Sequence, residues 1–220
     1  MKTKNKKQIK KIISYISCII IGYSMYPIIN KQVEYYKARQ SYEEYRKEKE
    51  DINKYPYWIT IESTPIDYPI AYGEGNNYYL YHDIKGKSSL SGSIFFEESE
   101  IPFDGSNTII YGHSMRDGSM FNNLHKFRKD HELFKNAILK VRNGDKIVTY
   151  KPLSIQITND DWFFRDLDEL SVNDAVSLIY EKSDYNLSRQ YDENSHIITL
   201  MTCEYTEEGN RLFVFWISEN

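Results

Sequence analysis

Cysteine is scarce in this sequence, with only Cys18 and Cys203 among 220 residues. Cys18 lies in an apolar segment, where a cysteine behaves as a small hydrophobic residue. Cys203 therefore lacks a partner for an internal disulfide and is a buried bystander, an intermolecular link or a reactive thiol. Neither the histidines nor the acidic residues cluster at metal-ligand spacing, and one thiol cannot build a structural zinc site, so we expect no metal.

Positive charge is in deficit beyond the amino terminus. Six lysines lie within the first eleven residues, well before the first acidic residue, Glu34, and leave 22 basic against 32 acidic residues in the remaining chain. They are Lys2, Lys4, Lys6, Lys7, Lys10 and Lys11. Nucleic-acid binding needs clustered Lys and Arg, so we expect no nucleic-acid partner. A glycine-rich phosphate loop is also absent from the sequence, and we expect no cofactor.

One long uncharged run, from Ile12 to Ile29, directly follows these lysines, and thirteen of its eighteen residues are apolar or aromatic. A membrane-spanning helix needs about 17–25 such residues, and basic flanks stay on the cytoplasmic side. We expect residues 1–11 to be a cytoplasmic tail and residues 12–29 a transmembrane signal anchor. A cleaved secretory signal is the alternative, but no small-x-small cleavage site follows the run.

Residues 30–55 are rich in Lys, Arg, Glu and Tyr and contain no Gly or Pro. Tyr35, Ala38, Tyr42 and Tyr45 recur at helical spacing, which predicts a helical stalk or a helix packed on the domain.

Residues 56–220 form the predicted globular domain, in which short β-type runs dominate. These runs are Trp58 to Glu62, Ser93 to Glu97, Thr108 to His113, Ala137 to Arg142, Lys146 to Lys151, Ser154 to Thr158, His196 to Cys203 and Arg211 to Ile217. Seven or eight short strands favour a barrel or a sandwich, so the predicted fold class is mostly β (α+β). Residues 120–135 and 171–182 are predicted helical insertions, the second beginning at a Ser171–Asp174 capping box.

Cys203 ends one predicted strand and is followed by a loop, where a substrate can reach a thiol. Attack on a carbonyl requires the thiolate, which is a minor form of a free cysteine at neutral pH, so a cationic or basic neighbour is needed. Of the five histidines, His113 alone closes another strand and precedes a loop. His82 lies in a polar loop, His125 and His131 in a charged helical stretch, and His196 at the far start of the cysteine strand.

Arg211 opens the last predicted strand, eight residues after Cys203. If these two strands are adjacent and antiparallel, the guanidinium returns to the level of the thiol and can stabilise a thiolate and a tetrahedral oxyanion. The alternatives are an arginine that pairs with a neighbouring glutamate and a strand-end histidine with a purely structural role.

Three spaced motifs in this order resemble the signature of sortases, the transpeptidases that anchor surface proteins in Gram-positive bacteria. They are Tyr111-Gly-His113, Thr199-Leu-Met-Thr-Cys203 and Arg211. Further segments are similar to class B sortases: Asn76-Asn-Tyr-Tyr-Leu80, Gly92-Ser-Ile-Phe95 and Gly112-His-Ser-Met-Arg-Asp-Gly-Ser-Met-Phe121. One departure is Met201, at a position that is often Ser in this class.

The resemblance implies an eight-stranded β-barrel with peripheral helices, preceded by an N-terminal membrane anchor helix. It implies Cys203 as nucleophile, His113 as general acid and base, and Arg211 as the oxyanion and substrate-positioning residue. It also implies a substrate groove at five further positions, which are Asn76, Leu80, Tyr111, Thr202 and Glu204.

The implied reaction cleaves a C-terminal sorting signal of the NPxTx kind after Thr and transfers the resulting acyl group to a peptidoglycan amine. The implied partners are sorting-signal-bearing surface proteins, the amine acceptor and the membrane, with the catalytic domain outside the cell. Two alternatives stay open. The first is a cysteine endopeptidase that resolves the thioester with water, and the second is a non-catalytic surface binding protein with an unreactive Cys203.

Overall fold

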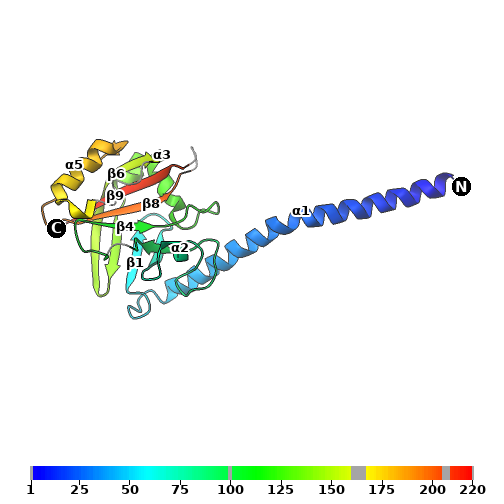
Figure 1. The fold of residues 1–220 in the computed structure, drawn as a ribbon, viewed down its shortest axis with the longest axis horizontal. Coiled ribbons are helices and arrows are strands. Elements are labelled where there is room, and N and C mark those ends of the chain that lie inside the picture. The colour runs from blue at the N-terminus through cyan, green and yellow to red at the C-terminus, as the bar shows by residue number, and fades with distance from the viewer. Residues whose placement is uncertain (1, 99–100, 160–166, 205–208, 220) are drawn as a thin grey trace.

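A computed structural model describes residues 2–98, 101–159, 167–204 and 209–219, with the side chains of residues 2–9 left out. A barrel occupies one end of the molecule, and a single long helix extends away from it (Figure 1). The strands are β1 (Tyr57–Ile61), β2 (Asp67–Ala71), β3 (Ile94–Phe96), β4 (Asn107–Tyr111), β5 (Leu139–Asn143), β6 (Lys146–Thr158), β7 (Tyr185–Asn186), β8 (Ile197–Cys203) and β9 (Arg211–Ser218).

Eight of these strands close into a barrel in the order β5-β1-β2-β3-β4-β8-β9-β6, and pairing of β6 with β5 completes the circle. The expected eight-stranded barrel with peripheral helices is confirmed. Two neighbouring pairs, β2–β3 and β4–β8, are parallel, and the other pairs are antiparallel. The two-residue β7 pairs with β6 outside the closed ring.

Strand β9 is apolar at every position from Leu212 to Ile217, and the packing of the barrel explains this pattern. Leu212, Val214 and Trp216 belong to one buried cluster, and the alternating Phe213, Phe215 and Ile217 belong to a second. Successive side chains of a strand point to opposite faces, so both faces of this strand are covered. The second cluster includes the apolar face of helix α5 (Val172–Lys182), whose N-cap Ser171 accepts a hydrogen bond from the Asp174 amide, as the capping box predicts.

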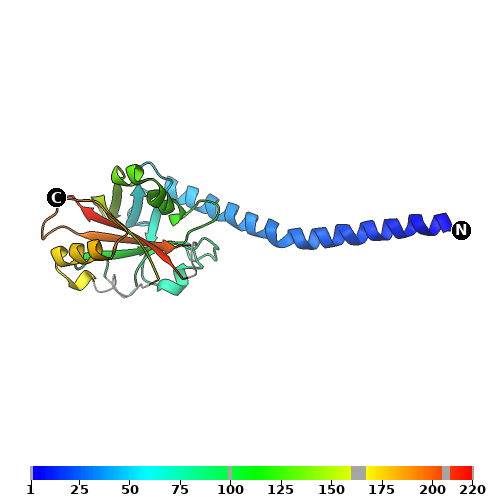
Figure 2. The same ribbon diagram turned by 90° about the horizontal axis from the view of Figure 1, so that it is seen from above.

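Helix α1 (Lys2–Lys47) is continuous through the predicted anchor and the tyrosine-rich segment. The carboxyl-terminal part packs on the barrel, because Tyr35, Tyr42 and Tyr45 are buried and the Tyr42 hydroxyl donates to the Gly92 carbonyl at 2.5 Å. The helix ends at Lys47, and turns occupy the rest of the stretch to residue 55. Residues 12–29 are exposed along the part that leaves the barrel (Figure 2). Judged by length and composition, helix α1 is long and apolar enough to cross a membrane.

Two parts of the sequence fold differently from the prediction. Residues 120–135 form not one helix but three short ones: η1 (Phe121–Leu124), α3 (His125–Lys129) and α4 (His131–Lys135). The break occurs at Asp130, whose extended backbone lets its carboxylate cap α4 by accepting from the Leu133 amide. The predicted strands on either side of Pro152 are one strand, β6, with an irregularity between Pro152 and Ser154. Strand β2 and the short helix α2 (Asn76–Tyr79) were not predicted.

Candidate active site

Cys203 and Arg211 are register partners at one end of the barrel, as the last residue of β8 and the first residue of β9. The two strands are therefore adjacent and antiparallel, which is the condition on which the role considered for Arg211 depends. Both residues are partly exposed. The Arg211 Nη1 group donates to the carbonyl oxygens of Gly209 and Asn210, at 3.1 and 3.2 Å. The guanidinium thus lies beside the carboxyl-terminal part of the loop that joins the two strands.

His113 reaches this end of the barrel through the parallel pairing of β4 with β8. The last register pair is Tyr111 with Met201, and the Gly112 amide then donates to the Met201 carbonyl at 3.2 Å. The Thr202 hydroxyl donates to the Gly112 carbonyl at 2.7 Å. If the parallel register of β4 and β8 is extended by two residues beyond Tyr111 and Met201, the backbone of His113 lies level with Cys203.

The His113 ring is oriented by Leu80, 33 positions earlier, because its Nε2 atom lies 2.9 Å from the Leu80 carbonyl oxygen. A carbonyl only accepts, so Nε2 carries a proton in this contact. Within the described chain, Nδ1 has no hydrogen-bond partner. A neutral imidazole in this tautomer has Nδ1 available to gain and lose a proton.

Gly112 permits this arrangement because no side chain fits at its position. An added Cβ would lie 2.7 Å from the Phe121 ring and would also overlap the Ile94 side chain. The close approach of β4 to β3 and η1 therefore requires glycine one residue before His113.

Helix α2 carries two of the predicted groove residues, at its start and just beyond its end. The Asn76 side-chain amide donates to Glu97 Oε1 at 2.6 Å, and its oxygen accepts from the Glu98 amide at 3.1 Å. Leu80 is the C-cap residue whose carbonyl contacts His113. These contacts connect the start of α2 to the end of β3, and the end of α2 to His113, the candidate base.

Tyr111 and Thr202, also predicted groove residues, are buried in the sheet. The Tyr111 hydroxyl donates to the buried Glu97 carboxylate, and the Tyr111 ring stacks on Phe95 with ring centroids 5.4 Å apart. The Thr202 hydroxyl is occupied by the Gly112 carbonyl. Both side chains therefore hold strand ends together in this structure. Glu97 was missed in the sequence analysis, because nothing in the sequence distinguishes it from the exposed Glu98 that follows it.

Glu204, the fifth predicted groove residue, directly follows Cys203 and is also buried. Its Oε2 atom lies 3.2 Å from His125 Nδ1 and 3.3 Å from Arg128 Nη1, both on α3. The sequence analysis set His125 aside as part of a charged helix, and Arg128 carried no signal of its own. The tertiary structure brings both to the residue after the candidate nucleophile.

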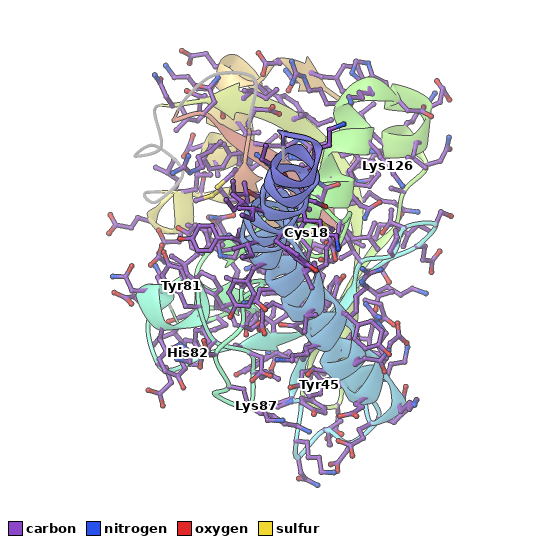
Figure 3. All side chains as sticks on the ribbon, turned by 90° about the vertical axis from the view of Figure 1, so that its right-hand side faces the viewer. Cys18, Tyr45, Tyr81, His82, Lys87 and Lys126 are labelled. Atoms are coloured by element: carbon purple, nitrogen blue, oxygen red, sulfur yellow. The ribbon has the colours of Figure 1, made fainter. Side chains whose placement is uncertain are left out.

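The other histidines lie away from this cluster of contacts. His82 stacks on Tyr78 near α2, and His131 stacks on Tyr185. Tyr81 and His82 lie on one side of α1 and Lys126 of α3 on the other when the barrel is viewed along that helix (Figure 3). His196 immediately precedes β8, the strand that ends in Cys203, and burial lowers its pKa from 6.5 to about 4. Among the described residues, no group of three His, Cys, Asp or Glu side chains could hold a metal ion.

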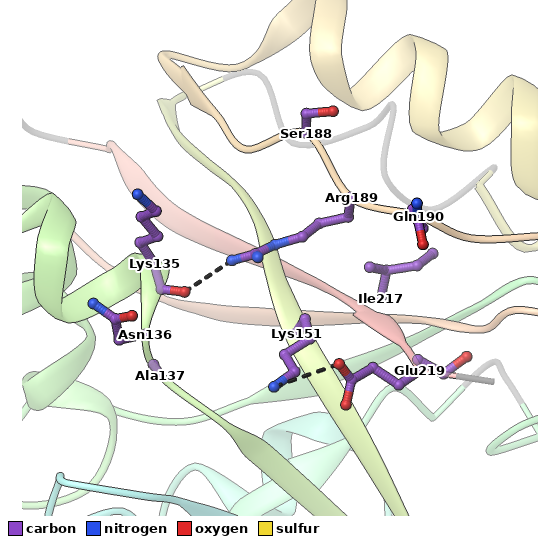
Figure 4. Close-up of a pocket in the computed structure, with 10 residues that line it drawn as sticks. Lys135, Asn136, Ala137, Lys151, Ser188, Arg189, Gln190, Ile217 and Glu219 are labelled. Atoms are coloured by element: carbon purple, nitrogen blue, oxygen red, sulfur yellow. Dashed lines mark hydrogen bonds and ion pairs between the residues drawn. The ribbon is translucent and has the colours of Figure 1, made fainter.

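A cavity of about 680 Å³ elsewhere on the barrel is not lined by Cys203, His113 or Arg211. It lies between the end of α4, β6, the end of β9 and the segment around Arg189 (Figure 4). Arg189 donates to the Lys135 carbonyl across this cavity at 2.8 Å, and Lys151 pairs with Glu219 at 3.4 Å. We assign the candidate active site to the strand ends, because they combine a thiol, an imidazole and a guanidinium.

The chain therefore folds into a closed β-barrel with a thiol, an imidazole and a guanidinium at the ends of neighbouring strands. A sortase-domain family model matches residues 59–216, and the chain belongs to the sortase family. It is 32% identical to sortase B of Listeria monocytogenes over 151 residues, which are 67% of this chain and 61% of that protein. It is 26% identical to sortase B of Staphylococcus aureus over 97% of each chain.

Solved structures place the chain near the class B members of the family. The structure of Clostridium perfringens sortase B superimposes with a TM-score of 0.66 and 28% identity, covering 79% of this chain and all of that one. The chain thus spans less than two thirds of the Listeria relative but the whole of this structural relative.

Proposed function

We propose that this chain is a membrane-anchored cysteine transpeptidase that cleaves a sorting signal of the NPxTx kind after Thr and transfers the protein to a peptidoglycan amine. The observation that carries the proposal is the pairing of Cys203 with Arg211, next to a strand that brings His113 to the same level. Membership of the sortase family and the similarity to sortase B proteins support it.

In the first half-reaction, the Cys203 thiolate attacks the carbonyl carbon of the substrate Thr. A carbon–sulfur bond forms, the carbon–nitrogen bond of the scissile peptide breaks, and protonated His113 donates its proton to the leaving amine. In the second half-reaction, an amine attacks the acyl-thioester, His113 accepts its proton, and the thiolate leaves. The contact with the Leu80 carbonyl supports this role, because it holds the ring by Nε2 and leaves Nδ1 for the proton that is exchanged.

Arg211 is the proposed oxyanion stabiliser. Both of its observed hydrogen bonds use Nη1, and within the described chain Nε and Nη2 make none. A guanidinium is permanently charged and has further planar donors to offer to a developing oxyanion.

The anchor helix supports a location at the outer face of the membrane. Helix α1 leaves the barrel on the side where β8 ends and β9 begins, and the C terminus lies on the opposite side (Figures 1 and 2). A membrane around residues 12–29 would therefore lie on the side of the candidate site, where anchored substrate precursors are found. In this topology residues 1–11 stay inside the cell.

The decisive experiment incubates the full chain in detergent with NPxTx peptides, with and without an amine acceptor, and analyses products by mass spectrometry. The proposal predicts an acyl adduct on Cys203 and an amine-dependent ligation product. Hydrolysis alone, unchanged by added amine, would instead identify a cysteine endopeptidase. A Cys203 that forms no adduct with any peptide and is not alkylated would identify a non-catalytic binding protein.

A further inference from the structure

A chain of polar side-chain contacts joins the residue after His113 to the residue after Cys203. The Ser114 Oγ atom lies 3.0 Å from His125 Nε2, and His125 Nδ1 lies 3.2 Å from Glu204 Oε2. Ser114 is buried, and the His125 and Glu204 side chains are 18% and 5% exposed. The two segments that carry the proposed base and nucleophile therefore meet through a third element, helix α3.

The proton positions in this chain follow from its acceptors. A glutamate carboxylate only accepts, so His125 Nδ1 carries a proton toward Glu204. Nε2 then accepts from the Ser114 hydroxyl when the ring is neutral, and donates to it when the ring is charged. Arg128 adds a permanent positive charge 3.3 Å from Glu204, which offsets the burial of this carboxylate. His125 can therefore contact Glu204 through Nδ1 whether its imidazole is neutral or charged.

Both nitrogens of His125 are occupied in this chain, which separates its role from that of His113. A ring that bridges two side chains is held in place and is poorly suited to exchange protons with a substrate. It is well suited to fix the distance between the two segments that it joins.

The backbone hydrogen bonds beyond the strand ends join these segments to different neighbours: the Phe121 amide donates to the His113 carbonyl at 2.9 Å, and the Glu204 amide donates to the Asn210 carbonyl at 3.0 Å. Strand β4 ends at Tyr111 and β8 ends at Cys203, so His113, Ser114 and Glu204 all lie beyond the paired strands. Helix α3 offers a rigid support, because Leu124, its N-cap residue, and Phe127, within the helix, are fully buried in the barrel core. A bridge from this helix to both segments restrains movement of one against the other.

We propose that His125 is a positioning residue that, through Ser114 and Glu204, keeps the imidazole of His113 and the thiol of Cys203 at one level. This inference deepens the proposed function and rests on it. Displacing a reacting group by about 1 Å can cost on the order of a hundredfold in rate, so loss of the bridge has a measurable effect.

The test uses the full chain in detergent and two readouts. The first is the rate of Cys203 alkylation by iodoacetamide as a function of pH, followed by mass spectrometry on the peptide that contains Cys203. It needs no substrate, and it reports how strongly the His113 imidazole influences the reactivity of the Cys203 thiol. The second is the single-turnover rate of acylation by an NPxTx peptide.

We expect His125→Ala to move the alkylation profile toward that of His113→Ala and to slow acylation at least about tenfold, with a smaller change in peptide affinity. His131→Ala is the matched control, because His131 lies on the next helix and its ring stacks on Tyr185, and it should match wild type. His125→Asn keeps a donor near Nδ1 and His125→Gln keeps one near Nε2, so each should give a smaller effect than alanine.

A folded His125→Ala chain with a wild-type alkylation profile and acylation rate would overturn the proposal. Should this variant not fold, Ser114→Ala breaks the same bridge at its other end and must show the same shift, or the proposal is wrong. A wild-type chain that forms no acyl adduct refutes the proposed function, whereas the alkylation profiles still decide whether His125 positions the pair. If His113→Ala itself alkylates like wild type, there is no thiol–imidazole pair and the positioning role is refuted.

Discussion

The Thr202 hydroxyl donates a hydrogen bond to the Gly112 carbonyl at 2.7 Å, and each of these residues immediately precedes a proposed catalytic residue. The bond joins the end of β8 to the continuation of β4. It therefore ties the backbone before Cys203 to the backbone before His113, where the main-chain ladder between the two strands is ending.

Replacing Thr202 with valine removes this bond at nearly constant volume and leaves a buried carbonyl without its side-chain donor. We expect a loss of about 1–2 kcal/mol in the free energy of unfolding, measured by urea denaturation, and slower acylation. Thr199→Val is the matched control, because Thr199 is equally buried on β8 and donates to Asn107 on β4 at 2.7 Å, far from Cys203. Equal acylation by the two variants would mean that the Thr202 bond serves stability alone.

Cys203→Ala should abolish thioester formation, because no other thiol is placed at the site. His113→Ala should slow acylation nearly as strongly, while alkylation of Cys203 by iodoacetamide stays detectable. Both are measured by mass spectrometry with a sorting peptide. Peptide cleavage by Cys203→Ala would refute the nucleophile assignment, and an equally severe defect in His131→Ala would refute the choice of His113.

Arg211→Ala should slow acylation by on the order of 10²–10³, or about 3–4 kcal/mol, because an oxyanion donor acts on charge that appears in the transition state. Peptide affinity, measured in a Cys203→Ala background, should change by less than about tenfold. Arg211→Lys keeps the charge but loses the planar donors, so it should rescue poorly.

Arg189→Ala controls for the loss of an arginine that also donates to two backbone carbonyls, those of Pro152 and Lys135. It should leave acylation unchanged. A collapse of affinity in Arg211→Ala with near-normal acylation at saturating peptide would identify Arg211 as a substrate clamp instead.

Acid should destabilise the fold through His196, because burial lowers its pKa from 6.5 to about 4. Between these values the unfolded chain binds a proton that the folded chain does not, so the free energy of unfolding falls as pH falls through this window. The loss attributable to His196 is at most about 3 kcal/mol, since the ring is partly exposed.

His196→Gln should reduce this pH dependence, as measured by urea denaturation at pH 7, 5.5 and 4. The ring contacts Thr108 and Tyr150 at 3.1 and 3.3 Å, so the variant has a lower stability at neutral pH as well. Parallel curves for wild type and variant across the window would show that His196 does not contribute to the acid sensitivity.

A chain that begins at residue 30 should be soluble and active on peptides, because the buried Tyr35, Tyr42 and Tyr45 are retained. The full chain should sediment with membranes and resist alkaline extraction, because residues 12–29 are apolar and exposed. A mature chain beginning after Ile29 in the culture medium would show that the segment is a cleaved signal.

The sequence by itself determined most of the strands, which favoured a barrel or a sandwich, and its resemblance to sortases added the eight-stranded barrel and the identities of the three proposed catalytic residues. The strands were predictable because β8 and β9 are short, apolar and bounded by loops, and a strand buried on both faces leaves that pattern in the sequence. The motifs ending in His113 and Cys203 and beginning at Arg211 were recognisable by their order and spacing. Strand β2 was missed because Pro69, which it contains, argues against a strand.

Only the tertiary structure decided what surrounds those residues. The Leu80 carbonyl on His113 and the His125 ring on Glu204 join positions 33 and 79 residues apart. Neither contact has a local signature, because a backbone carbonyl looks the same at every position and a histidine in a charged helix resembles a solvated one. These contacts arise when the barrel closes and brings α2 and α3 to the ends of β4 and β8. Periodicity reports which face of an element is buried, but only the closed fold sets which side chains meet there.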